Sequence, residues 1–123
     1  LASGTGIGGI TVNGDVTTVQ TINAAIHAQN DLTFANYSIA PAASLDVNGA
    51  LTSPASGRVL TFAGNGRMNV NGGIAAQFSD VVKVNEGTLK LGAANAFTGK
   101  LDVQDGNVIV TANGALGATV LVP

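Results

Sequence analysis

The sequence Asp46-Val47-Asn48-Gly49 returns as Asn69-Val70-Asn71-Gly72, and Thr11-Val12-Asn13-Gly14 is a third version of the same four residues. Two further copies, Val84-Asn85-Glu86-Gly87 and Val103-Gln104-Asp105-Gly106, have one residue inserted before the glycine. The five valines are separated by 35, 23, 14 and 19 residues. A chain that repeats one strand-and-turn unit is typical of a solenoid, whose coils bury a core only by stacking on one another.

The spacing of the copies indicates the length of one coil. If the long first gap hides another copy near Leu32-Thr33-Phe34, the mean period is about 18 residues. We therefore expect an all-β chain folded as a right-handed parallel β-helix, a β-solenoid of roughly six coils. The alternative is a small antiparallel β-sandwich, because sequences such as Asn13-Gly14 and Asp105-Gly106 supply the positive φ angles of hairpin turns.

Stretches in which apolar and polar residues alternate predict strands with one buried face. The expected strands are Ile10–Val12, Leu32–Phe34, Leu45–Val47, Val59–Phe62, Met68–Val70, Val82–Val84, Leu89–Leu91, Leu101–Val103, Val108–Val110 and Val120–Val122. Residues 21–28 stay ambiguous. There, Ile22, Ala25 and Ile26 would share one face of a helix, whereas the surrounding sequence favours a strand or an irregular coil.

The composition excludes several classes of protein. Only 10% of the 123 residues are charged, against about 25% in an ordinary soluble domain. The absence of cysteine excludes disulfides, thiolate metal sites and a cysteine nucleophile. A net charge of -2 with five basic residues predicts no nucleic-acid partner, and no apolar run reaches the roughly 18 residues of a transmembrane segment. We expect residues 1–123 to form one domain, with residues 1–9 as a flexible or N-terminal leader.

Residues 87–117 follow a longer pattern. Gly87-Thr88-Leu89-Lys90-Leu91-Gly92 leads through Asn95 and Phe97-Thr98-Gly99 into two alternating strands, and the stretch closes on Leu116-Gly117. It resembles the autotransporter-associated β-strand repeat, or passenger-associated transport repeat, of bacterial surface and secreted proteins. The resemblance implies a parallel β-helical passenger segment that serves as a stalk or assists export, and it implies no catalytic residues.

The same residues have a physical interpretation as scaffold. Leucines and valines at alternate positions would point into the core and Phe97 would fill a corner, while Gly92 and Gly99 would permit bends. Asn95 would lie in a turn or stack on a neighbouring residue in a ladder. The scaffold residues expected from this motif are Gly87, Leu89, Leu91, Asn95, Phe97, Gly99, Leu101, Val103, Gly106, Val108 and Val110.

Three local patterns are compatible with chemistry, and each has a simpler explanation. Gly4-Thr5-Gly6-Ile7-Gly8-Gly9, with Asp31 downstream, fits a dinucleotide-binding loop, but it precedes a strand instead of opening a helix. His27 is the single histidine, so neither a zinc site nor a catalytic triad has an evident set of partners. Asn36-Tyr37-Ser38 fits a glycosylation sequon once. We predict no metal, no cofactor and no catalytic residue.

Acidic and basic side chains on neighbouring strands are the remaining candidates, for a glycan-cleaving site. Alternation places Asp46, Asp102, Lys83 and Lys90 on outward faces, where they also solvate an apolar strand and guard its edge against pairing. The full set comprises Asp46, Asp102, Asp105, Lys83, Lys90 and Lys100. Binding or cleavage of glycans remains an alternative, although the chain offers no Trp and only Tyr37 for stacking on a sugar ring.

The sequence therefore predicts a structural, non-catalytic β-helical segment of an extracellular or bacterial cell-surface protein or fibre. The ends of such a segment present unpaired backbone groups, and the apolar Val120, Leu121 and Val122 lie at the C-terminal end. The expected partners are flanking coils of a longer parent chain, or further copies of the chain itself stacked end to end as a filament.

Overall fold

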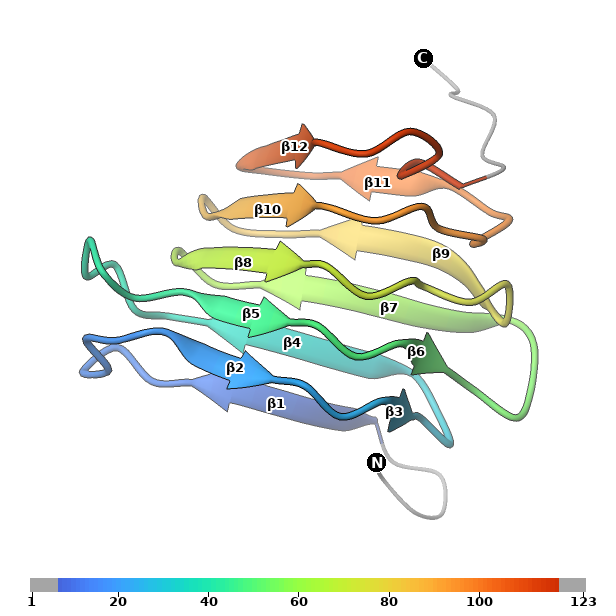
Figure 1. Ribbon diagram of the computed structural model, residues 1–123, viewed down its shortest axis with the longest axis horizontal. Coiled ribbons are helices and arrows are strands. Elements are labelled where there is room, and N and C mark those ends of the chain that lie inside the picture. Colours follow the sequence, from blue (N-terminus) through green and yellow to red (C-terminus); the bar gives the residue numbers. More distant parts are fainter. Residues whose placement is uncertain (1–6, 118–123) are drawn as a thin grey trace.

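The computed structural model describes residues 7–117, which form strands joined by turns and loops (Figure 1). The strands are β1 (Gly8–Val12), β2 (Gln20–Ile22), β3 (Ile26–His27), β4 (Leu32–Asn36), β5 (Leu45–Val47), β6 (Leu51–Thr52), β7 (Arg58–Ala63), β8 (Arg67–Val70), β9 (Phe78–Lys83), β10 (Thr88–Leu91), β11 (Leu101–Val103) and β12 (Asn107–Val110). No helix occurs within residues 7–117, and the ambiguous segment 21–28 falls on β2 and β3. Because β1 begins at Gly8, the last two residues of the stretch 1–9 belong to a strand.

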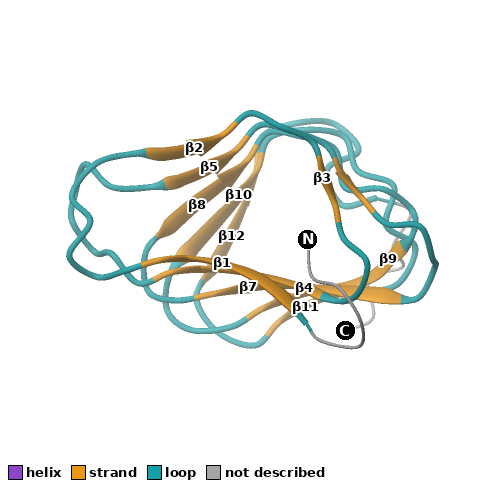
Figure 2. Ribbon diagram, turned by 90° about the horizontal axis from the view of Figure 1, so that it is seen from below, coloured by secondary structure: helices purple, strands orange, loops and turns teal. Residues whose placement is uncertain are grey.

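Every pair of neighbouring strands in this part of the chain is parallel. Sheet 1 has the strand order β1-β4-β7-β9-β11, sheet 2 the order β2-β5-β8-β10-β12, and sheet 3 pairs β3 with β6. Followed from β1 to β2 and β3, the chain turns clockwise as it recedes from the viewer, so the coil is right-handed (Figure 2). The predicted parallel β-solenoid is confirmed, and the antiparallel sandwich is wrong.

The coils are longer and fewer than the repeat predicted. In sheet 1, Gly8 pairs with Leu32, Leu32 with Leu60, Leu60 with Val81, and Val81 with Leu101, in steps of 24, 28, 21 and 20 residues. The described residues thus make four complete turns from β1 to β11, not six coils with a period near 18. The steps vary because connections on both sides of the coil differ in length. The corner loops from sheet 1 to sheet 2 have seven, eight, three, four and three residues in successive coils, and the connections that lead back to sheet 1 have four, five, seven and nine residues.

The five related tetrads do not occupy equivalent positions in the coils. Val47 and Val70 are register partners in sheet 2. Val12 and Val103 instead end strands of sheet 1, and Val84 follows β9 directly. Because β1 and β11 of sheet 1 and β5 and β8 of sheet 2 all end in valine followed by a polar turn, the same local sequence occurs at two different corners and its spacing does not give the period.

The Asn-Gly turns also differ from expectation. Gly106 and Gly114 have positive φ angles of 78° and 73°, but Gly49 and Gly72 do not. A Cβ at Gly72 would lie 2.0 Å from the carbonyl oxygen of Gly49 in the preceding coil. Glycine is required at this corner because stacked backbones approach closely, and not because the turn is left-handed.

Inward side chains stack in columns that run from coil to coil. Phe34 and Phe62 have ring centroids 5.7 Å apart and ring planes 12° from parallel. The rest of the core is built from buried aliphatic residues at matching register, including Leu32 with Leu60 in sheet 1 and Leu45 with Met68 in sheet 2. Each coil therefore buries its apolar face only against its neighbours along the axis.

Candidate functional site

Polar side chains on the outer face of sheet 2 bond one coil to the next. Asp46 Oδ1 accepts hydrogen bonds from Ser44 Oγ and from Asn69 Nδ2, which lies one coil further on, both at 2.8 Å. Asp46 faces outward between the buried Leu45 and Val47, as alternation predicts. Ser44 is 4% exposed and donates to a carboxylate rather than to a histidine, so this pair does not make an accessible nucleophile with its base.

Three asparagines form a ladder at the corner between sheets 2 and 3. Asn48 Nδ2 donates to Asn23 Oδ1, and Asn71 Nδ2 donates to Asn48 Oδ1, each at 2.9 Å. The motif residue Asn95 does not form such an Asn ladder. Its Oδ1 accepts from the backbone N–H of Ile74 at 2.9 Å, and its Nδ2 donates to the carbonyl of Ala115 at 2.6 Å, so it bridges the coils on either side.

Two carboxylates at the start of sheet 1 strands accept backbone amides of the next coil. Asp31 Oδ1 accepts from Val59 N at 2.9 Å, and Asp80 Oδ1 accepts from Lys100 N at 3.0 Å. Asp31 is the acidic residue downstream of the glycine-rich sequence 4–9. Its contact is structural, and the described end of that sequence lies in β1 rather than before a helix.

Lys83 points into the core, so its predicted outward position is wrong. In register it follows Phe62, its side chain is fully buried, and its Nζ donates to the carbonyl oxygens of Val84 at 2.9 Å and Asn85 at 2.7 Å. Burial lowers the pKa of the ammonium group, an effect that the nearby charge of Asp105 partly opposes. The aliphatic stem takes the place of a core residue while the turn carbonyls satisfy the charged head.

The predicted candidates for a glycan-cleaving cluster do not gather at one site in the fold. Asp46 and Lys90 share the outer face of sheet 2. Asp102 lies on sheet 1, where its Oδ2 is 4.0 Å from Lys100 Nζ in an exposed ion pair. Asp105 Oδ1 accepts the N–H of the glycine that follows it. No two of these carboxylates are brought together as an acid and base pair by the hydrogen bonds or ion pairs of residues 7–117.

His27 and the sequon asparagine both have structural partners. His27 Nδ1 lies 2.9 Å from Thr52 Oγ1, and residues 7–117 contain no group of three or more potential metal ligands. Asn36 is fully buried, with its Nδ2 donating to the Arg67 carbonyl at 2.8 Å and its Oδ1 accepting from Ser38 N at 3.0 Å. Attachment of a glycan to Asn36 is therefore incompatible with this fold.

The motif residues divide between the core and the last described coil. Leu89, Leu91 and Phe97 are buried, and Leu101 and Val108 are partly buried against the core. Val103 and Val110 have inward register but are each 45% exposed, since β11 and β12 are the outermost strands of their sheets. Val120, Leu121 and Val122, the residues predicted for end stacking, lie outside the described residues.

The first described coil also opens part of its apolar interior. A cavity of about 330 Å³ lies between β1 and β2 and is lined by Ile10, Val16 and Ile22 among others. These residues pack against the core but are only partly buried. Both ends of the described solenoid therefore expose members of the core columns together with the outermost strands of sheets 1 and 2.

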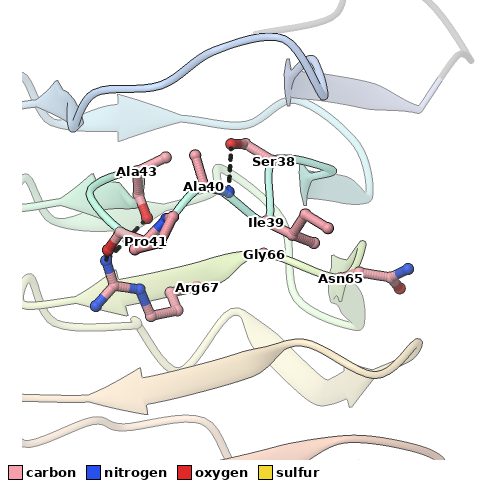
Figure 3. A pocket seen from close by; sticks show the side chains of 8 residues that line it. All are labelled: Ser38, Ile39, Ala40, Pro41, Ala43, Asn65, Gly66 and Arg67. Carbon is pink, nitrogen blue, oxygen red and sulfur yellow. Dashed lines mark hydrogen bonds between the residues drawn. The ribbon is translucent and has the colours of Figure 1, made fainter.

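A second cavity, of about 320 Å³, lies on the side of the solenoid under the corner loop of residues 37–44. Figure 3 shows the Arg67 guanidinium at one end of it beneath Pro41 and Ala43, with Ile39 and Asn65 at the other end. Arg67 Nη2 donates to the carbonyl oxygens of Pro41 and Ala43 at 2.5 and 3.1 Å. Sequence reasoning missed this cavity, because the loops that form it, residues 37–44 and 64–66, are distant in sequence and become neighbours only through stacking of the coils.

Comparison of the chain with protein-family models, curated proteins and solved structures finds no match. Residues 7–117 also contain no helix of the length and hydropathy needed to cross a membrane.

Proposed function

We propose that the chain is a structural, non-catalytic section of an extracellular, autotransporter-like surface protein or fibre, in which it acts as a stalk or as a scaffold that assists export. The observation that carries the proposal is the use of its polar side chains. Asp46, Asn48, Asn71, Asp80 and Asn95 all hold one coil to the next. These carboxylate and amide side chains thus make contacts that stabilise the stack of coils. The resemblance of residues 87–117 to a passenger repeat supports the same structural role.

A section of a longer solenoid needs ends that accept further coils. The open columns and outermost strands at both ends meet this need, whether the next coil comes from the parent chain or from another copy. A self-assembling filament subunit is the second candidate, because the two ends expose the same columns. Ile10 and Val103 belong to one inward column, so a second copy stacked head to tail would place one β-branched residue on another.

Sedimentation velocity over a wide concentration range, with electron microscopy of the same samples, tests the proposal. We expect association that grows with concentration. Uniform rods at low concentration favour the filament subunit, and weak, irregular association only at high concentration favours a section of a longer chain. A compact monomer at every concentration would mean that the ends are closed and would contradict both.

Two neighbouring residues supply a matched pair of variants for this experiment. Val110 has inward register at the open end, whereas Ile109 faces outward on the same strand, and their exposed fractions are similar at 45% and 48%. If copies stack through their ends, V110K suppresses assembly by burying a charge in the junction, and I109K leaves it nearly unchanged. The reverse order would indicate lateral association of sheet 2 faces instead.

A further inference from the structure

The side cavity exists because two successive corner loops differ in length. Eight residues, 37–44, connect β4 to β5, whereas three residues, 64–66, connect β7 to β8 in the next coil. The long loop therefore projects beyond the short turn beside it, and the cavity of about 320 Å³ lies between them (Figure 3). Its volume is at the lower end of the range for small-molecule sites, which begins at about 300 Å³.

Hydrogen bonds from both loops hold the walls of this cavity in place. Ser38 N donates to Asn36 Oδ1 at 3.0 Å, Ser38 Oγ donates to the Val16 carbonyl, and Ala40 N donates to Ser38 Oγ at 3.3 Å. Gly66 N donates to the Asn36 carbonyl at 2.8 Å from the opposite wall. A recess with fixed walls loses little conformational entropy when it takes up a ligand.

One end of the cavity holds a cation, Arg67, that makes no ion pair with an acid among residues 7–117. Arg67 uses Nη2 on the two loop carbonyls, and a guanidinium has five N–H donors, so Nε and Nη1 retain donors beyond those contacts. Lys100 and Asp102 form the ion pair found among the described residues, so no described carboxylate lies within ion-pair distance of Arg67. A guanidinium placed against neutral carbonyls attracts an anion, and carboxylates match its geometry.

The other end offers an apolar surface. Ile39 is 77% exposed, although it sits on a loop that is pinned by the contacts of Ser38 on one side and of Pro41 on the other. Exposing a large aliphatic side chain on a rigid loop is unfavourable for a plain connection, for which three residues suffice in the next coil. The guanidinium of Arg67 and the side chain of Ile39 together favour a ligand that has an anionic group and an apolar face.

We propose that this cavity binds a small carboxylate-bearing ligand with one apolar face, its carboxylate on the Arg67 guanidinium and its apolar face against Ile39. The volume suits a single ring, and two sources supply this chemistry: a terminal acidic sugar of a glycan, or a free cyclic organic acid. The inference is independent of the stalk role, because the cavity lies on the side of the solenoid and not at its ends.

The test is a titration of the ¹⁵N-labelled chain, followed by the amide resonances of Ile39 and Gly66, with glucuronate, cyclohexanecarboxylate and glucose as separate ligands. We expect saturable shifts with one or both carboxylates and none with glucose. A preference for glucuronate identifies the acidic sugar as the source, and a preference for cyclohexanecarboxylate identifies the organic acid. No saturable shift with either carboxylate, or equal binding of glucose, overturns the proposal.

Three variants assign the contacts. R67Q should weaken carboxylate binding by roughly tenfold or more, because a hydrogen bond to a charged group contributes at least that factor. I39S, which leaves the bonds of the loop intact, should weaken it several-fold. K90Q removes an outward cation from the same sheet but outside the cavity, and should bind as the unchanged chain does. If R67Q loosens the loop, the effect of I39S on carboxylate binding decides whether the ligand lies in this cavity. The assignment is overturned if I39S and R67Q both leave binding intact, or if K90Q abolishes it.

Discussion

Lys83 is a polar residue at an inward position of β9, so it departs from the alternation of apolar and polar residues while the strand itself is kept. Its position continues the column of Phe34 and Phe62, and its ammonium group ends at two carbonyl oxygens of the next turn. Because the stem is long and apolar, the core accepts it, and because the turn carbonyls point at the head, the charge has partners. Period-two alternation cannot distinguish such an inward lysine from an outward one.

The buried ammonium group predicts a pH dependence of stability at alkaline pH. Burial lowers the pKa of Lys83 in the folded chain, whereas the unfolded chain keeps the ordinary lysine value of 10.5. Between these two values the unfolded state binds more protons, so the contribution of Lys83 to stability rises with pH and levels off above 10.5. K83M lacks this group, and we expect the unchanged chain to gain stability relative to K83M as the pH rises through this window.

Urea unfolding of both chains at several pH values from neutral to above 10.5 measures this difference. Curves of stability against pH that stay parallel for the two chains would show that Lys83 titrates equally in both states. The remaining lysines, Lys90 and Lys100, are outward or exposed and cancel in the comparison.

The asparagine ladder predicts a measurable cost for its middle member. Asn48 donates to Asn23 and accepts from Asn71, so N48A removes both hydrogen bonds at once. The ladder is exposed, and the expected loss of unfolding free energy is about 1 kcal/mol. Asn65, an exposed asparagine of a corner loop without a side-chain hydrogen bond in the described structure, provides the control, and N65A should stay within about 0.5 kcal/mol. Equal effects of the two substitutions would deny the ladder a role in stability.

At the scale of the strands and turns, close stacking of the Asn-Gly corners predicts opposite outcomes for two adjacent glycines. A Cβ at Gly72 would meet the Gly49 carbonyl oxygen at 2.0 Å, whereas a Cβ at Gly73 would lie 3.5 Å from the Ala94 carbonyl oxygen, an ordinary contact. Neither glycine has a positive φ, so backbone strain does not enter the comparison. We expect G72A to lose about 1–3 kcal/mol and G73A to be nearly neutral. Thermal or urea unfolding measures both, and a G72A chain as stable as G73A would contradict the stacking of this corner.

The sequence predicted most of the strands, but of their arrangement it predicted only the class, a parallel β-solenoid. Alternation located the strands that contain Phe34, Leu45 and Leu89, because one buried face imposes period two on any strand. The two-residue strands β3 and β6 are too short to show a period. Repetition favoured the solenoid over the hairpin alternative, but an Asn-Gly pair favours a tight turn in either topology, so only the parallel pairing of the strands excluded that alternative.

Register and the side cavity were not predictable, for a common reason. Connections of different length shift each coil by a different amount, and the repeated valines lie at two different corners of the coil. The spacing of the valines therefore gives no constant period. Arg67 meets Pro41 and Ala43 only because the shorter loop follows the longer one in the stack. A contact set by the difference in length between two loops leaves no local pattern in either of them.

As a whole, the molecule is one-dimensional, because each coil contacts chiefly the coils before and after it. In such an array stability is close to a sum of coil and interface terms, so coils with one neighbour open more readily than coils with two. Strands β7, β8 and β9 have neighbours on both sides, whereas β1, β2, β11 and β12 are outermost in their sheets. We therefore expect slow amide hydrogen exchange in β7–β9 and faster exchange toward both ends.

The same measurement, repeated across concentration, separates an open end from a closed one. If a second copy adds to the end, the amides of β11 and β12 become protected as the concentration rises, and V110K should prevent this gain while I109K should not. Protection that is uniform from β1 to β12 at every concentration would show that the coils unfold as a single unit. The description of stability as a sum of coil and interface terms would then be wrong. The argument that each end can accept a further coil would also fail, because an end that is as stable as the centre gains little from another coil.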